Sequence, residues 1–170
     1  MGSEVEMRPL ERADARAFED AFSEMGWDKP AAQFDQYLRE QEVGHRTVLV
    51  AQWEGRVAGY VTILWESRDP VFSAGGIPEI NDFNVLLKWR RKGIGTALMD
   101  AAEAMVAKRS SVVGLGVGLH KGYGSAQRLY VRRGYVPDGT GVVVAGTTVP
   151  EGAEIRLDDE PMLRMTKELD

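Results

Sequence analysis

The feature that most constrains this chain is the segment that opens its best-defined helix. Gly95–Lys108 has apolar side chains three and four positions apart, as an amphipathic helix does, and Ile77–Leu87 before it reads as a strand. The turn between them is Arg90-Arg91-Lys92-Gly93-Ile94-Gly95-Thr96, and no acid follows until Asp100. A helix start carries unpaired N–H groups and partial positive charge, so cations there are unfavourable unless an anion binds. The sequence therefore predicts a phosphate-type anion site at this turn, with glycines that let backbone approach the ligand.

The spacing of the glycines narrows the kind of phosphate ligand. The Walker pattern, with four residues between its first glycine and Gly-Lys-Ser/Thr, is absent, and Gly95 is not followed three residues later by the last glycine of a dinucleotide fingerprint. The turn therefore argues against nucleotide hydrolysis and against hydride transfer.

The remaining predicted elements intermix strands and helices. Helices are expected over Ala13–Phe22, Gln33–Val43 and Ser125–Arg133, and strands over Val5–Leu10, Thr47–Trp53, Val57–Trp65, Ser111–Leu119, Tyr135–Val136 and Pro161–Lys167. Glu54-Gly55 predicts a hairpin turn. Ser125 is expected to cap its helix and Gly134 to end it. Loops are expected over 67–76 and Asp138–Glu160. This order predicts an α/β or α+β fold in one domain, 1–170.

Composition excludes several classes of function. The 170 residues include no cysteine and two histidines, His45 and His120, so neither a thiolate nucleophile nor a zinc site is expected, and we predict no metal. The formal charge of −5 disfavours nucleic-acid partners and suits cationic small molecules. No apolar run reaches the roughly 20 residues of a membrane helix, and the N-terminus does not resemble a signal peptide. We therefore expect a cytoplasmic protein without a membrane partner.

Three segments resemble the GNAT superfamily of acyl-CoA-dependent N-acetyltransferases. Arg90-x-x-Gly93-x-Gly95 is similar to its Q/R-x-x-G-x-G/A signature, and Ile80–Arg90 to its fourth strand and the entry into that loop. Ala126–Tyr135 is similar to its A-x-x-L-Y-x-x-x-G-F helix. The resemblance runs from Val5 to Leu169. It implies a mixed, mostly antiparallel sheet of about seven strands, splayed between strands 4 and 5 and flanked by about four helices.

The resemblance also implies an activity, the transfer of an acetyl group from acetyl-CoA to a primary amine by direct attack in a ternary complex. The acceptor would be a small molecule such as an amino acid, a polyamine or an aminoglycoside-like compound. The different-class alternative is a non-catalytic acyl-CoA-binding or regulatory module on the same fold. Family members are often dimers, so a homodimer through the C-terminal strands is also implied.

Catalytic roles follow from the resemblance residue by residue. Tyr130 matches the family's general acid, which would protonate the departing thiolate. Glu79 lies where several family members place a catalytic glutamate, and Asp82 is the rival for the role of base. Regular alternation would put Glu79 on the same face as Val85, unless a bulge intervenes.

The cofactor contacts are implied in the same way. Backbone groups of Val85 and Leu87 would pair with the pantetheine arm, and the N–H of Val85 would face the thioester oxygen. The pyrophosphate would lie on the N–H groups from Arg91 to Thr96, beside Arg90 and Lys92. Where the family often has a CoA-binding asparagine this chain has Tyr123, so either Tyr123 and Ser125 replace it or Ser125 only caps the helix. Candidate acceptor contacts are Trp27, Tyr37, Trp65 and the run Asp158-Asp159-Glu160.

Overall fold

Two compact units make up the described part of the chain. The computed structural model describes residues 4–170. One unit combines the chain up to Trp65 with Ile80–Met105, and the other combines Glu66–Glu79 with Val106–Asp170.

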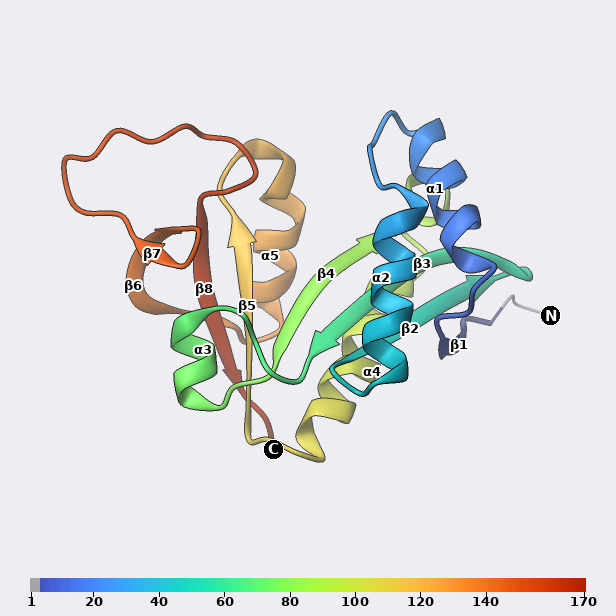
Figure 1. Cartoon of the computed structure of the whole chain (residues 1–170), viewed down its shortest axis with the longest axis horizontal. Helices are drawn as coiled ribbons and strands as arrows, with labels where there is room; N and C mark the ends of the chain where they lie inside the picture. Colours follow the sequence, from blue (N-terminus) through green and yellow to red (C-terminus); the bar gives the residue numbers. More distant parts are fainter. Residues whose placement is uncertain (1–3) are drawn as a thin grey trace. The chain divides into compact units, whose positions relative to one another are not determined.

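The first unit has its strands in the order β1-β2-β3-β4 (Figure 1). Its elements are β1 (Glu6–Pro9), α1 (Asp14–Glu24), α2 (Ala31–Glu42), β2 (Arg46–Trp53), β3 (Arg56–Leu64), β4 (Glu79–Val85), the 3-10 turn η1 (Leu87–Trp89) and α4 (Ile94–Ala107). The β2–β3 hairpin is confirmed, with Trp53 paired to Arg56 across a turn in which Glu54 and Gly55 have φ of 51° and 73°. Positive φ at both positions is what such a tight turn requires.

Helices lie on both faces of this sheet. Neighbouring residues of a strand point to opposite faces. Tyr60 of β3 meets the ring of Phe18 in α1, whereas a Cβ built at Gly59 would lie 3.3 Å from the side chain of Leu98 in α4. The helices α1 and α2 therefore cover one face and α4 covers the other. The expected helix over Gly95–Lys108 is confirmed to within a residue at each end.

The second unit has the strand order β5-β8-β6-β7. It consists of α3 (Pro70–Gly75), β5 (Val112–Gly118), the 3-10 turn η2 (Lys121–Tyr123), α5 (Gly124–Arg132), β6 (Val136–Val144), β7 (Thr147–Thr148) and β8 (Met162–Glu168). The pairs β5–β8, β8–β6 and β6–β7 are antiparallel. The entry to β4 also belongs to this unit, where the carbonyl of Pro78 accepts from the N–H of Gly114, 3.0 Å away.

The predicted fold class is confirmed. The sheet is mixed and mostly antiparallel with helices on it, although residues 4–170 hold eight strands and five α-helices instead of about seven and four. The splay between strands 4 and 5 stays a prediction, as does the single domain.

Several expected boundaries are wrong for local reasons. The loop predicted over 67–76 contains α3, because Asp69 caps two backbone N–H groups and Pro70 fits the first helical position. Ser125 is not the cap of α5, since Tyr123 holds that place without a side-chain bond. Leu87 leaves the expected strand and begins η1.

The largest error is the loop expected over Asp138–Glu160. Its first part continues β6 to Val144 and forms β7, so the strand predicted over Tyr135–Val136 is much longer and begins after Tyr135. Gly139 and Gly141 have φ of 86° and 76° and fall in an irregularity between Pro137 and Val142. Glycines therefore mark a bulge here that leaves the strand continuous.

Candidate active site

Asp82 lies in the middle of β4 with a left-handed backbone, φ 61°. This conformation is rare for a residue with a side chain and interrupts the alternation along the strand. Among residues 4–170, five side chains donate to its carboxylate: Lys29 (3.0 and 3.1 Å), Gln33 (3.2 Å), Tyr37 (2.9 Å), Tyr60 (2.6 Å) and Asn84 (2.9 Å). Strain of this kind persists when the surroundings over-determine it, and it concentrates at functional sites.

Aromatic rings surround this carboxylate. Tyr60 is fully buried and meets the edges of Phe18 and Phe34 at centroid distances of 5.1 and 5.2 Å. The ammonium of Lys29 lies 5.7 Å from the ring centroids of both Phe22 and Tyr60. The side chain of Asp82 is 16% exposed, and a cation beside it meets both negative charge and aromatic faces.

The two phenols serve Asp82 as donors. Burial, and after it the negative charge of Asp82, raises the pKa of both Tyr37 and Tyr60 above the ordinary phenol value. Both hydroxyls hold their protons at neutral pH, so neither phenol is a candidate base.

The guanidinium of Arg46 packs on the ring of Tyr37. The guanidinium of Arg46 lies 4.1 Å from the centroid of the Tyr37 ring, and its Nε lies 2.5 Å from Glu40 Oε2. Arg46 also donates to Asn81 Oδ1 at 3.1 Å, in the residue before Asp82. These contacts tie α2, β2 and β4 together around the candidate site.

The cationic turn before α4 is open to solvent. Arg90 to Gly93 are all exposed, and Arg91 and Gly93 have φ of 62° and 76°. The first turn of α4 carries no acid, and the N–H of Ala97 bonds to the carbonyl of Gly93 at 3.0 Å. Exposed cations beside a helix start without acids fit a polyanionic ligand.

Val85 and Leu87 lie between Asp82 and this turn. The carbonyl of Val85 accepts from Arg90 Nε at 3.2 Å, while Leu87 is half exposed in η1. A Cβ at Gly59 would lie 2.6 Å from the carbonyl oxygen of Asn84 and 3.2 Å from Cα of Val85. Gly59 thus lets β3 approach β4 closely at Asn84 and Val85.

The other predicted catalytic groups belong to the second unit. Glu79 is buried, 8% exposed, and accepts from Ser67 Oγ at 2.5 Å. Tyr130 is 7% exposed, with its ring centroid 5.8 Å from that of Tyr135. Both side chains are buried inside the unit. The roles of base for Glu79 or Asp82 and of acid for Tyr130 stay predictions.

The predicted contacts around α5 are also in the second unit. Tyr123 donates its hydroxyl to Asp159 Oδ1 at 3.1 Å, and His120 Nε2 lies 2.7 Å from the same oxygen. Ser125 is exposed in the first turn of α5. Asp159 belongs to the acidic run that was expected to contact the acceptor, and here it connects the segment after β7 to η2.

Sequence reasoning named Asp82 and Tyr37 but missed their partners Lys29, Gln33, Tyr60 and Asn84. Lys29 comes 53 positions before Asp82, and no pattern in the sequence links the two. Of the other expected acceptor contacts, Trp27 stacks on Phe22 at 5.9 Å. Trp65 donates instead to Thr47 Oγ1.

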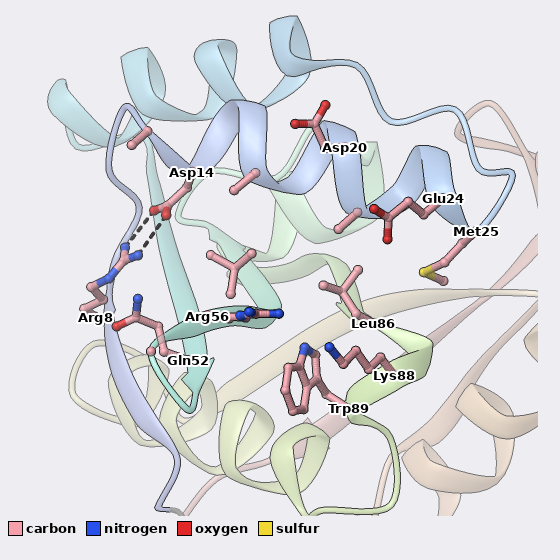
Figure 2. A pocket seen from close by; sticks show the side chains of 15 residues that line it. Arg8, Asp14, Asp20, Glu24, Met25, Gln52, Arg56, Leu86, Lys88 and Trp89 are labelled. Carbon is pink, nitrogen blue, oxygen red and sulfur yellow. Dashed lines mark hydrogen bonds and ion pairs between the residues drawn. The ribbon is translucent and has the colours of Figure 1, made fainter.

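A separate open cavity of about 500 Å³ lies in the first unit between α1, the β2–β3 hairpin and η1 (Figure 2). Asp20 and Glu24 line it from α1, and Arg56 and Lys88 from the hairpin and η1. The pair formed by Arg8 and Asp14 belongs to its lining at one end. None of the side chains that donate to Asp82 lines this cavity.

Residues 10–135 match the model of the acetyltransferase (GNAT) family. The chain belongs to the GNAT acetyltransferase family. No curated protein matches the sequence significantly. The predicted family and enzyme class are therefore confirmed.

Solved structures share the fold of this acetyltransferase at low identity. An N-acetyltransferase of Staphylococcus aureus Mu50 has a TM-score of 0.72 at 13% identity, over 99% of this chain and 100% of the other. The yncA protein of Salmonella typhimurium, solved with its cofactor acetyl-CoA, has a TM-score of 0.68 at 18% identity, over 98% and 94%. A chimera of the spermidine N-acetyltransferase SpeG from Vibrio cholerae has a TM-score of 0.68 at 19% identity, over 98% and 96%.

In the acetyltransferase, residues 4–170 contain no group of three or more His, Asp or Glu side chains placed to hold a metal ion. Over the same residues, none of the helices combines the length and the hydropathy needed to cross a membrane.

Proposed function

We propose that this acetyltransferase moves the acetyl group of acetyl-CoA to the primary amine of a cationic small molecule, by direct attack while both are bound. The observation that carries the proposal is Asp82, a carboxylate held in a strained backbone among aromatic rings and beside an ammonium group. It lies three residues before Val85, on the strand that leads into the cationic turn. Membership of the GNAT family is the reason for naming acetyl-CoA as the acetyl donor.

The anionic part of acetyl-CoA fits the turn before α4. Arg90 and Lys92 would neutralise the pyrophosphate, and the N–H groups of Arg91 to Thr96 would bond to its oxygens. The place that a Cβ would take at Gly93 has no protein atom within 4 Å, so the backbone there is open to a ligand, whereas a Cβ at Gly95 would lie 3.3 Å from Cζ of Phe83. The backbone of Val85 and Leu87 would hold the pantetheine arm, and Tyr123 and Ser125 are proposed to contact the cofactor from α5.

The reaction balances without any further reactant. The acceptor enters as an ammonium ion and gives one proton to a base, for which Asp82 is the first candidate and Glu79 the second. Its nitrogen lone pair then attacks the thioester carbonyl carbon, so that a C–N bond forms and the C–S bond breaks. Tyr130 would protonate the sulfur so that CoA leaves as a thiol, and the second nitrogen proton, lost as the amide forms, would restore the phenol of Tyr130 through solvent while the base releases its own proton to solvent. The N–H of Val85 would stabilise the charge on the carbonyl oxygen.

The experiment that tests this proposal is the release of thiol from acetyl-CoA with a panel of amines. The panel includes amino acids, polyamines such as spermidine, which the name of one structural relative mentions, and aminoglycosides. Wild type is compared with Tyr130→Phe and Asp82→Asn. We expect turnover with one class of amine and a loss of about 10²-fold in kcat for Tyr130→Phe, within the range of general acid catalysis.

Binding of acetyl-CoA without turnover of any amine would contradict the proposal. It would favour the alternative, a non-catalytic module that binds acyl-CoA. Undiminished turnover in both variants would remove Tyr130 and Asp82 from the mechanism while leaving the reaction itself established.

A further inference from the structure

Lys29 is the most buried residue of an otherwise exposed segment. The chain from Gly26 to Pro30 connects α1 to α2, and its residues other than Lys29 are exposed. The side chain of Lys29 is only 19% exposed, and its ammonium reaches Asp82 through contacts of 3.0 and 3.1 Å. The segment therefore delivers one primary ammonium to the candidate acceptor site.

The contacts of Asp82 leave no place for an incoming amine. A carboxylate offers about four lone-pair positions. Lys29 and Asn84 donate to Oδ1, while Lys29, Gln33, Tyr37 and Tyr60 donate to Oδ2. Of these five donor residues Lys29 is the charged one, so an ammonium from the acceptor could replace it without changing the charge of the site.

We propose that Lys29 occupies the position of the acceptor's ammonium, and that a primary ammonium on a methylene chain displaces it during the reaction. This inference rests on the proposed function. It assigns the substrate class from the group that fills the site: three N–H donors at the end of an unbranched chain, with the nitrogen 5.7 Å from the ring centroids of Phe22 and Tyr60. Lysine-like amino acids and polyamines carry a primary ammonium on a methylene chain, and aromatic amines do not.

The segment that carries Lys29 lies mostly on the surface of the first unit. Gly26 has a φ of 74° and ends the turn after α1, while Pro30 precedes the first residue of α2. Trp27, which is 41% exposed, stacks on Phe22 and is the segment's aromatic contact with the core. Departure of Lys29 uncovers the place beside the rings of Phe22 and Tyr60, which the acceptor's own ammonium would fill.

The first test asks whether the site accepts an alkylammonium ion in place of Lys29. Lys29→Ala, and Lys29→Gln in case the first variant does not fold, are titrated with n-butylammonium chloride in the absence of acetyl-CoA, by calorimetry and thermal melting. We expect saturable binding and a raised Tm for these variants, binding about tenfold weaker in wild type, and neither effect for Lys29→Ala with Asp82→Asn. A folded Lys29→Ala or Lys29→Gln protein that does not bind n-butylammonium would overturn the proposal.

The second test separates a displaced group from a merely structural one. If Lys29 fills the site in about nine molecules of ten, Lys29→Met lowers the KM of the amine about tenfold and leaves the KM of acetyl-CoA unchanged. Lys29→Arg raises the amine KM, because a guanidinium can form two hydrogen bonds with the carboxylate and is harder to displace. Lys108→Met, in the exposed turn after α4, is the matched control. An amine KM that rises or stays constant in Lys29→Met would overturn the displacement.

The two proposals fail in different ways. If n-butylammonium binds to Lys29→Ala but no amine is acetylated by wild type or by Lys29→Met, the cation site stands and the transferase function is wrong. If amines are acetylated but the Lys29 variants leave amine binding and the amine KM unchanged, the function stands and this inference is wrong.

Discussion

The hydroxyl of Tyr60 lies 2.6 Å from Oδ2 of Asp82, the shortest of the hydrogen bonds that this carboxylate accepts from residues 4–170. Tyr60 is fully buried in β3, and the carboxylate is 16% exposed. The removal of this donor leaves a largely buried charged group short of one partner, which typically costs about 1–3 kcal/mol.

Tyr60→Phe is therefore expected to lower the free energy of unfolding by that amount while keeping the ring contacts with Phe18 and Phe34. Urea denaturation measures the change. Tyr123→Phe is the matched control, because it also removes a hydroxyl bonded to an aspartate, but Asp159 is 80% exposed and the loss should stay under about 0.5 kcal/mol. Equal losses in the two variants would show that burial of the Asp82 pair does not matter.

The buried ion pair of the second unit gives a larger expected effect. Arg164 is 1% exposed, and its Nε lies 2.8 and 2.9 Å from the two carboxylate oxygens of Asp69. Asp69→Asn keeps a residue able to cap α3 but leaves the guanidinium without its counter-charge, so we expect a loss of about 3–5 kcal/mol. The exposed pair Arg156–Asp158 is the control, and Asp158→Asn should change stability by less than about 0.5 kcal/mol.

The cationic turn predicts that its variants impair acetyl-CoA more than acetyl-pantetheine as the acetyl donor. Arg90→Ala and Lys92→Ala should each raise the KM of acetyl-CoA about tenfold, because each removes a cation expected beside the pyrophosphate. Their effect on acetyl-pantetheine, which lacks that group, should be small. Arg12→Ala, exposed before α1, serves as the control. Equal effects on both donors would place the anionic part of the cofactor elsewhere.

Gly59 predicts a steric effect on β4. Gly59→Ala would put a Cβ 2.6 Å from the carbonyl oxygen of Asn84, so β3 and β4 must separate. We expect a loss of about 1–3 kcal/mol in stability together with a raised KM for acetyl-CoA. Gly124→Ala, in the first turn of α5 with no atom within 4 Å of the new Cβ and φ of −58°, should be neutral or slightly stabilising.

The contacts of Asp159 predict that part of the stability of the second unit depends on pH. Its hydrogen bonds from His120 and then Tyr123 hold the pKa of the Asp159 carboxyl below the ordinary value of 3.8. A depressed pKa means that the contact contributes stability above pH 3.8, and that this contribution is lost as the pH falls through the lower, folded-state value. An NMR titration should place the midpoint of Asp159 below 3.8 in wild type and nearer 3.8 in His120→Ala. An unchanged midpoint would contradict the assignment.

Local patterns predicted most of the fold, and long-range contacts account for what was missed. The spacing in Gly95–Lys108 and the turn at Glu54-Gly55 are signals within a few residues, so α4 and the β2–β3 hairpin were predictable. The glycines of β6 carry the same local signal as a loop, and only the pairing of β6 with β8 distinguishes a bulge. Pairing of this kind is not visible from one segment.

The candidate site divides in the same way. Asp82 was predictable because it lies on a strand that resembles a known one, but its left-handed φ and its partners from α2, β3 and the segment before α2 were not. Lys29 and Tyr60 lie 53 and 22 positions from Asp82. Their convergence depends on how the helices cover the sheet, which no spacing in the sequence records.

The wide spread of these partners along the chain sets an order of assembly. During synthesis the ribosome releases Lys29 and Tyr37 long before Asp82, so the carboxylate finds its donors only after α1, α2 and the β2–β3 hairpin have formed. Contacts of such high sequence separation form late, because closing the intervening chain costs entropy first. A nascent chain arrested shortly before β4 would therefore contain the Lys29 ammonium and the aromatic rings without the carboxylate of Asp82. The proposed recognition of an amine would be among the last properties this enzyme acquires.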